Sequence, residues 1–154
     1  MTGLDLKAFI AVPPAVVMQA FFDPEALGAW WRVRRAVTTP RILGPYAIEW
    51  VPTEFRDDVL GRLGGVFRGT VMQYHAKQGF FVADAYWLPP DGEPIGPMAL
   101  EATCTLLGDR TVLKVRQSGW ESSPRWSRYY DLIATGFTLA LDELKRYAES
   151  HWND

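Results

Sequence analysis

The chain has 154 residues, with 16 Lys and Arg against 18 Asp and Glu, which gives a formal net charge of −2. This length fits one domain built around one hydrophobic core, so we expect a single domain over residues 1–154. Because the charges nearly balance, no overall field collects phosphate backbones or anionic lipid, and we expect no nucleic-acid partner.

Cysteine usage and the N-terminal residues bear on the compartment. Cys104 is the only cysteine, which excludes an internal disulfide and a cysteine-cluster metal site. The first residues lack the basic start and apolar run of a signal peptide, and no apolar stretch approaches the length of a membrane span. We therefore expect a cytoplasmic protein with no membrane insertion.

The first third of the chain predicts one strand followed by two short helices. Residues 4–12 mix apolar and polar positions and end at Pro13-Pro14, which closes a strand and suits the first turn of a helix. Residues 15–22 carry apolar side chains at helical spacing. Asp23-Pro24-Glu25 then has the pattern of an N-cap, a first-turn proline and an acid near the positive end of a helix that runs to about Trp31.

The middle of the chain predicts an antiparallel sheet. Runs rich in β-branched and aromatic residues, most of them separated by turn signals, favour a meander of consecutive strands. These runs are 36–39, 46–51, 66–75, 79–88, 98–107 and 111–118. The segment Pro52–Gly65 fits neither pattern, and we expect a loop or one short helix at the rim of the sheet.

The last segment predicts a long amphipathic helix that opens at Ser123-Pro124 and continues to about Ser150. Its polar positions fall on the face opposite to the apolar one, so the helix must lie along an apolar surface, and the sheet is the only large one. The apolar face consists of Trp126, Tyr130, Ile133, Phe137, Leu141, Leu144 and Ala148.

Several local motifs resemble one known family. Residues 12–17 (VPPAVV) and 22–31 (FDPEALGAWW) resemble the opening signature of the bacterial family that is similar to the activator of heat-shock-protein-90 ATPase homologue 1, within the START-like (SRPBCC) superfamily. Residues 65–71, 111–115 and 118–120 resemble its central strand, last strand and exit. The resemblance implies an α+β helix-grip fold: a curved antiparallel sheet of six to seven strands around a long C-terminal helix, with two short helices after the first strand and a cavity between sheet and helix.

Strand alternation predicts which side chains face the helix, because polar residues such as Lys114, Glu101, Arg68 and Asp84 mark the outer face. The predicted inner set is Ile48, Trp50, Phe67, Gly69, Val71, Gln73, Phe81, Ala83, Ala85, Trp87, Leu100, Ala102, Cys104, Leu106, Leu113, Val115 and Gln117. Small inner residues such as Gly69, together with Gly136 on the helix, predict unfilled space. The alternative is an interior that the protein's own aromatic rings fill.

We expect this space to bind a small apolar or aromatic, lipid-like molecule, which reaches it beneath the segment Pro52–Gly65. The predicted ligand-binding residues are Trp30, Trp50, Phe67, Val71, Trp87, Ala102, Gln117, Phe137 and Leu141. No catalytic, metal-ligating or cofactor-binding residue is assigned, because His75 and His151 lack a suitably spaced carboxylate and no phosphate-binding loop is present.

Two alternatives stay open because the fold hosts many functions. The first is an enzyme of the polyketide cyclase or aromatase kind, which needs only a shaped pocket and one or two polar groups such as Gln117 or Tyr86. The second is a co-chaperone-like interaction module, for which the proline-rich loop 88–97 offers a docking or homodimer surface.

Overall fold

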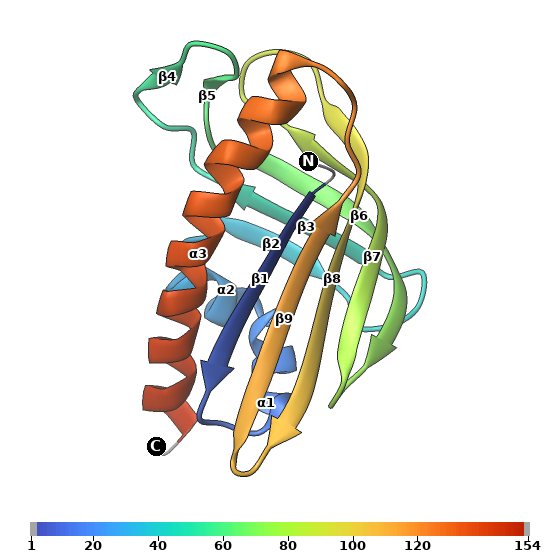
Figure 1. The fold of residues 1–154 in the computed structure, drawn as a ribbon, viewed down its shortest axis with the longest axis vertical. Helices are drawn as coiled ribbons and strands as arrows, with labels where there is room; N and C mark the ends of the chain where they lie inside the picture. Colours follow the sequence, from blue (N-terminus) through green and yellow to red (C-terminus); the bar gives the residue numbers. More distant parts are fainter. Residues whose placement is uncertain (1–2, 153–154) are drawn as a thin grey trace.

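The computed structural model describes residues 3–152 (Figure 1). The elements in chain order are β1 Gly3–Ile10, α1 Pro14–Ala20, α2 Pro24–Trp30, β2 Arg35–Thr38, β3 Pro45–Trp50, β4 Arg56–Asp57, β5 Gly61–Arg62, β6 Gly65–His75, β7 Gly79–Leu88, β8 Ile95–Leu107, β9 Arg110–Ser118 and α3 Pro124–Trp152. Seven strands form one antiparallel sheet in the order β1-β9-β8-β7-β6-β3-β2. The predicted helix-grip fold is confirmed.

The two short helices begin where the sequence predicts. Pro14 is the first helical residue of α1, and Pro24 is that of α2. The side chain of Asp23 accepts a hydrogen bond from the backbone N–H of Glu25 at 3.2 Å, which satisfies one of the free donors at the start of α2. These helices fill one end of the concave face of the sheet (Figure 1).

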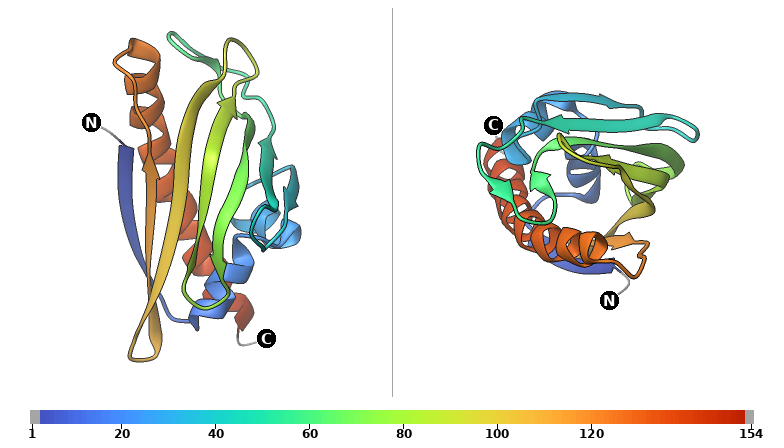
Figure 2. Two further views of the ribbon diagram at one scale, coloured as in Figure 1. Left: turned by 90° about the vertical axis from the view of Figure 1, so that its right-hand side faces the viewer. Right: turned by 90° about the horizontal axis from the view of Figure 1, so that it is seen from above.

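The terminal helix α3 closes the open side of the curved sheet. Ser123 caps it, because its Oγ accepts a hydrogen bond from the backbone N–H of Trp126 at 3.2 Å. The view from above in Figure 2 shows the sheet curling round and α3 lying across the gap between its two edges. The helix buries Trp126, Tyr129, Tyr130, Phe137, Ala140, Leu141, Leu144 and Ala148.

Aromatic rings pack the interior solidly beside α1 and α2. Phe21 and Phe22 lie against Phe80 with ring centroids 5.3 and 5.0 Å apart, and the ring of Tyr46 stacks on Phe80 at 5.7 Å. The buried hydroxyl of Tyr46 donates to the backbone carbonyl of Phe21 at 2.8 Å. In this end of the molecule the rings occupy the interior themselves, as the close-packed alternative predicted.

The inner face of β7 departs from the predicted alternation. Phe80 and Val82 are buried, whereas the predicted Phe81 and Ala83 are only half-buried. Asp84 causes the change of face: it has a φ of 52°, and the pairing of β7 with β8 shifts register between Val82 and Ala85. Beyond this bulge Ala85 and Trp87 point inward as predicted.

Two more predictions of inward-facing residues, Gln73 and Leu106, are wrong for local reasons. Gln73 is exposed because the pairing of β6 with β7 shifts register between Val71 and Gln73. Leu106 is 59% exposed because it lies near the tip of the β8–β9 hairpin, which projects from the end of the sheet (Figure 1). The segment Pro52–Gly65 forms the small hairpin β4–β5 rather than a helix.

We expect the inner face of α3 to carry much of the stability. Replacing the fully buried Leu144 by Ala should lower the free energy of unfolding by about 2–5 kcal/mol, because the deletion leaves a cavity. The matched control is Leu139→Ala, at a leucine of the same helix that is 62% exposed, which should change it by less than about 0.5 kcal/mol. Urea unfolding measures both values, and equal effects would contradict the assigned faces of α3.

Candidate functional site

A cavity of about 840 Å³ lies between α3, the sheet and the hairpin β4–β5. It occupies the end of the molecule opposite to the packed aromatic rings. The sheet contributes Trp50, Phe67 and Trp87, and the hairpin segment contributes Thr53, Leu60, Leu63 and Gly64. The apolar residues of the helical side are Trp30, Trp31, Tyr129, Leu132, Ile133, Gly136, Phe137, Leu139 and Ala140. The lining is therefore apolar and aromatic over most of its area.

Three of the tryptophans that line the cavity use their indole N–H on the protein itself. Trp30 Nε1 donates to the carbonyl of Ala20 at 2.9 Å, and Trp50 Nε1 donates to the carbonyl of Trp31 at 3.0 Å. Trp87 Nε1 donates to the carbonyl of Gly64 at 2.7 Å. These bonds fix the ring orientations, and they leave only the apolar ring surfaces for contact with a ligand.

An aromatic stack separates the cavity from the packed end. Trp31 lies parallel to Trp30 with centroids 4.9 Å apart and an interplanar angle of 13°. The ring centroid of Phe137 on α3 lies 4.8 Å from that of Trp31, and the rings of Trp31 and Trp50 form a T-shaped pair with centroids 5.5 Å apart. We call Trp30, Trp31 and Phe137 the aromatic floor, because they join α2 to α3 beneath the open volume.

The inner wall also carries a buried polar group. Tyr129 lines the cavity from α3, and its Oη lies 2.8 Å from Gln117 Nε2 on β9. The same Nε2 lies 2.7 Å from the sulfur of Met98 on β8. Burial raises the pKa of Tyr129 far above its ordinary value, so the phenol stays neutral.

The two glycines that the sequence predicts beside unfilled space, Gly69 and Gly136, have different surroundings. A Cβ built on Gly136 meets nothing within 4 Å, whereas a Cβ built on Gly69 comes within 2.7 Å of Val82. Gly69 therefore allows close packing between strands, and Gly136 leaves room at the cavity. In the middle of a helix glycine costs about 1 kcal/mol relative to alanine, so this room has an energetic cost.

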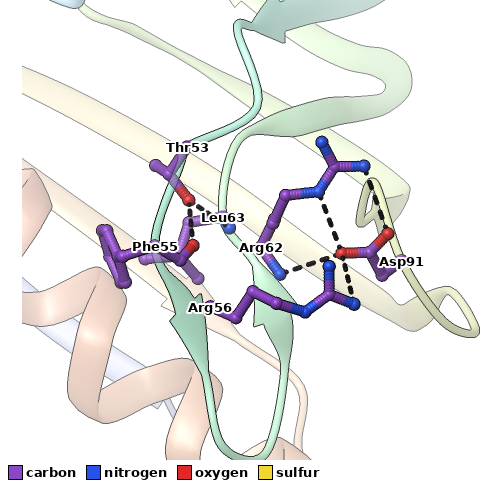
Figure 3. Close-up of polar contacts among 6 residues, drawn as sticks. All are labelled: Thr53, Phe55, Arg56, Arg62, Leu63 and Asp91. Carbon is purple, nitrogen blue, oxygen red and sulfur yellow. Dashed lines mark hydrogen bonds and ion pairs between the residues drawn. The ribbon is translucent and has the colours of Figure 1, made fainter.

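Ion pairs hold the hairpin β4–β5 from two sides. On one side Asp57 Oδ1 accepts a hydrogen bond from Arg128 Nε of α3 at 2.8 Å, and Arg128 Nη2 lies 2.7 Å from the same oxygen. On the other side Asp91, in the proline-rich loop 88–97, pairs with Arg62 at 3.1 Å and with Arg56 at 3.4 Å (Figure 3). The loop thus supports the hairpin, and its role as a docking surface stays a prediction.

Charged side chains occur only on part of the cavity boundary. Arg32, Asp142, Glu143 and Arg146 belong to its lining, and all but the half-buried Glu143 are exposed. Glu143 and Arg146 neutralise each other through an ion pair of 2.6 Å. Arg32 has a φ of 57° directly after the aromatic floor, a backbone conformation that is uncommon outside glycine. The polar boundary therefore faces water, and the apolar wall lies further in.

The structure separates the nine predicted ligand-binding residues into two groups. Trp30, Trp50, Phe67, Trp87 and Phe137 line the cavity. The other four do not: Val71, Ala102, Gln117 and Leu141 are buried in the surrounding core. The sequence predicts these four residues because their strand and helix faces point inward, but packed side chains cover those inward faces.

Sequence reasoning missed several residues of the cavity wall. The sequence predicts Trp31 at the end of a helix and within the motif of residues 22–31, and Leu60 and Leu63 lie in the segment that fits neither pattern. Tyr129 and Ile133 lie on the predicted helix, and their positions one turn apart on α3 were the available signal. The helix contributes Tyr129, Leu132, Ile133, Leu139 and Ala140 in addition to Phe137 and Gly136, which the sequence predicts at this space.

The remaining chemistry-bearing residues lie outside the cavity wall. His75 and His151 are exposed, at the end of β6 and near the end of α3. Burial raises the pKa of the Cys104 thiol to about 12, which keeps it protonated and unreactive. Within residues 3–152 no group of three or more His, Cys, Asp or Glu side chains is placed to hold a metal ion.

Comparison with known proteins identifies the family. The family model described as Activator of Hsp90 ATPase homolog 1-like protein matches residues 11–149. The chain belongs to this family. Its SRPBCC fold is a scaffold that supports ligand binding. Among curated proteins, no sequence matches the chain. Over residues 3–152, no helix has both the length and the apolar character needed to cross a membrane.

Solved structures share the fold of this family member at low sequence identity. MLL2253 from Mesorhizobium loti is 18% identical with a TM-score of 0.73, and the match covers 97% of this chain and 98% of that one. A protein from Rhodobacter sphaeroides is 17% identical with a TM-score of 0.75, over 97% and 94% of the two chains. DynU16, from the dynemicin biosynthetic locus, is 17% identical with a TM-score of 0.64, over 97% of this chain and 48% of its own.

The ion pair between Asp57 and Arg128 predicts a pH dependence. The hydrogen bond from Arg128 lowers the pKa of Asp57 from 3.8 to about 2. Because the pKa is lowered in the folded protein, the contribution of this ion pair to the stability of the fold is complete above about pH 4. It is lost as the pH falls through about 2. The melting temperature of Asp57→Asn should therefore lie below that of the wild type near neutral pH, and the two should converge on acidification.

Differential scanning calorimetry across this range measures the effect. Asp58→Asn is the matched control, because the adjacent Asp58 is exposed and forms no ion pair within residues 3–152. A gap between wild type and Asp57→Asn that stays constant down to about pH 2 would contradict the assigned interaction.

Proposed function

We propose that this protein binds a small apolar or aromatic molecule in the cavity between the sheet and α3. The observation that carries the proposal is a cavity of about 840 Å³ whose wall presents the surfaces of indole and phenyl rings. Pockets for small molecules typically measure about 300–1,000 Å³ and have mainly apolar walls with few polar groups. The volume and the lining both match this description.

The proposed contacts with the ligand come from both the helices and the sheet. Trp30, Trp31 and Phe137 support the ligand from the aromatic floor, and Trp50, Phe67 and Trp87 contact it from the sheet. Because hydrogen bonds and stacking already fix these tryptophans, little side-chain entropy is lost when a ligand binds. The hairpin β4–β5 covers the access side and excludes water through Leu60 and Leu63.

A catalytic role for the same cavity is the second candidate, and the observation that favours it is the buried hydroxyl of Tyr129 at the wall. Its raised pKa makes the phenol a hydrogen-bond donor rather than a base at neutral pH. Such a donor can polarise a carbonyl group, as cyclisation of a polyketide chain requires. Incubation of the protein with its ligand distinguishes the two: an unchanged ligand supports binding alone, and a new product supports catalysis.

We also propose a cytoplasmic location without a nucleic-acid partner. The near-neutral net charge supports the absence of a nucleic-acid partner. The single, buried cysteine supports a cytoplasmic location.

The direct test is to identify what the protein carries. Protein purified from its own host is examined by native mass spectrometry, and any bound molecule is extracted and identified. We expect an apolar or aromatic compound, and such ligands should raise the melting temperature when added to the empty protein. A protein that is always empty, and whose melting temperature no member of a broad lipid and aromatic library changes, would overturn the proposal.

Gly136 offers a variant that closes the cavity. Gly136→Leu should keep the fold, because a side chain there enters open space and leucine favours the helix by up to about 1 kcal/mol. The new side chain should reduce affinity for the identified ligand at least about 10-fold by occupying its volume. Isothermal titration calorimetry measures this change.

The control for this variant is Thr135→Leu, which places the same side chain on the adjacent, solvent-facing position of α3. It should bind as the wild type does. If Gly136→Leu also binds normally, the ligand does not occupy the cavity beside α3.

A further inference from the structure

The contacts of Gln117 determine which way its amide points. One amide atom lies 2.7 Å from Met98 Sδ and 2.8 Å from Tyr129 Oη. A thioether sulfur has no hydrogen and acts only as an acceptor, so the amide oxygen would be repelled there. The atom is therefore the NH₂ group, which donates to both neighbours. It follows that Tyr129 Oη is an acceptor in its contact with Gln117.

This arrangement leaves the hydroxyl hydrogen of Tyr129 available. A phenol donates one hydrogen bond, and no described residue accepts it. Tyr129 is only 3% exposed, and it is one of the residues that line the cavity. A buried donor without an acceptor costs about 1–3 kcal/mol, so this group favours a ligand that supplies one.

The other polar groups of the inner wall are already bonded. Trp30, Trp50 and Trp87 donate to backbone carbonyls, and the hydroxyl of Thr53 donates to the carbonyl of Phe55. Arg32 and Arg146, the cations of the cavity boundary, are exposed to water. A charged acceptor placed at Tyr129 would lose its hydration without gaining an ion pair, whereas a neutral carbonyl loses far less.

We propose that the ligand of this cavity carries a neutral carbonyl group that accepts a hydrogen bond from Tyr129 Oη. Gln117 is the positioning residue, since its amide occupies the acceptor side of the hydroxyl and directs the hydrogen away from β9. This inference rests on the proposed ligand-binding function and narrows it to aromatic or apolar ketones, esters and related carbonyl compounds.

Matched probes test the proposal. The acetyl derivatives of naphthalene, anthracene and pyrene are compared with their isopropenyl analogues, in which a CH₂ group replaces the carbonyl oxygen at nearly the same shape. Wild-type protein should bind the ketone of at least one pair about 3- to 10-fold more tightly than its alkene, the range expected for one hydrogen bond. Isothermal titration calorimetry gives both affinities.

Two tyrosine variants locate the effect. Tyr129→Phe should remove the preference for the ketone and leave alkene affinity within about 2-fold. Tyr130→Phe is the matched control, because it deletes the hydroxyl of the next buried residue of α3, which donates to the carbonyl of Gly119 and does not line the cavity. It should keep the preference. Equal binding of ketone and alkene to the wild type would overturn the inference while the proposed binding function stands.

A measurement on the wild type alone guards against a Tyr129→Phe chain that fails to fold. The carbonyl stretch of the bound, carbonyl-¹³C-labelled ketone should move to lower frequency than in hexane, because the carbonyl accepts a hydrogen bond. An unshifted band would overturn the inference. Failure of every ketone and every alkene to bind would instead count against the proposed function itself.

Discussion

The cavity depends on the contact between the aromatic floor and α3. Trp31 lies between Trp30 of α2 and Phe137 of α3, with centroid distances of 4.9 and 4.8 Å. Large rings at this point hold the helix away from the centre of the sheet, while α3 also packs against β1 and α1. Removing this spacer would let the helix settle onto the strands, as dense interiors favour.

The aromatic floor divides the interior into a part that side chains fill and a part that stays open. On one side Phe21, Tyr46 and Phe80 fill the volume and bond their polar atoms internally. On the other side the same residue types form a wall around unfilled volume. The hairpin β4–β5 completes that wall: Leu60 packs in the hydrophobic core, and ion pairs attach the hairpin to α3 and to loop 88–97. Ion pairs of this kind are weaker than core packing and depend on salt.

Much of the fold could be predicted because local signals agreed with one another. The cap at Asp23, the prolines at 14 and 24 and the apolar face of α3 each specified a helix start or a buried face, and the structure places them accordingly. The wrong predictions of inner-face residues came from positions that interrupt the strand alternation and that no sequence feature marks. Asp84 adopts a positive φ and reverses the inner face of β7, and nothing in its neighbourhood, such as a glycine, marks a bulge.

The site was less predictable than the fold because inward and cavity-lining are different properties. Val71 and Ala102 face inward, yet packed side chains cover them, while Gly136 borders open space. Which inward positions stay uncovered depends on where α3 crosses the sheet. The alternation of side chains along a strand gives no information about that crossing. The bond between Gln117 and Tyr129 joins β9 to α3 and follows from the same crossing.

The fixed indoles also make the protein its own optical reporter. Four of its seven tryptophans, Trp30, Trp31, Trp50 and Trp87, border the cavity, and three of these keep their N–H on backbone carbonyls. Indole emission responds both to hydrogen bonding and to the polarity around the ring faces. Because these hydrogen bonds stay constant, a shift in the emission wavelength would report whether water or an apolar ligand contacts the ring faces. No added dye would be needed.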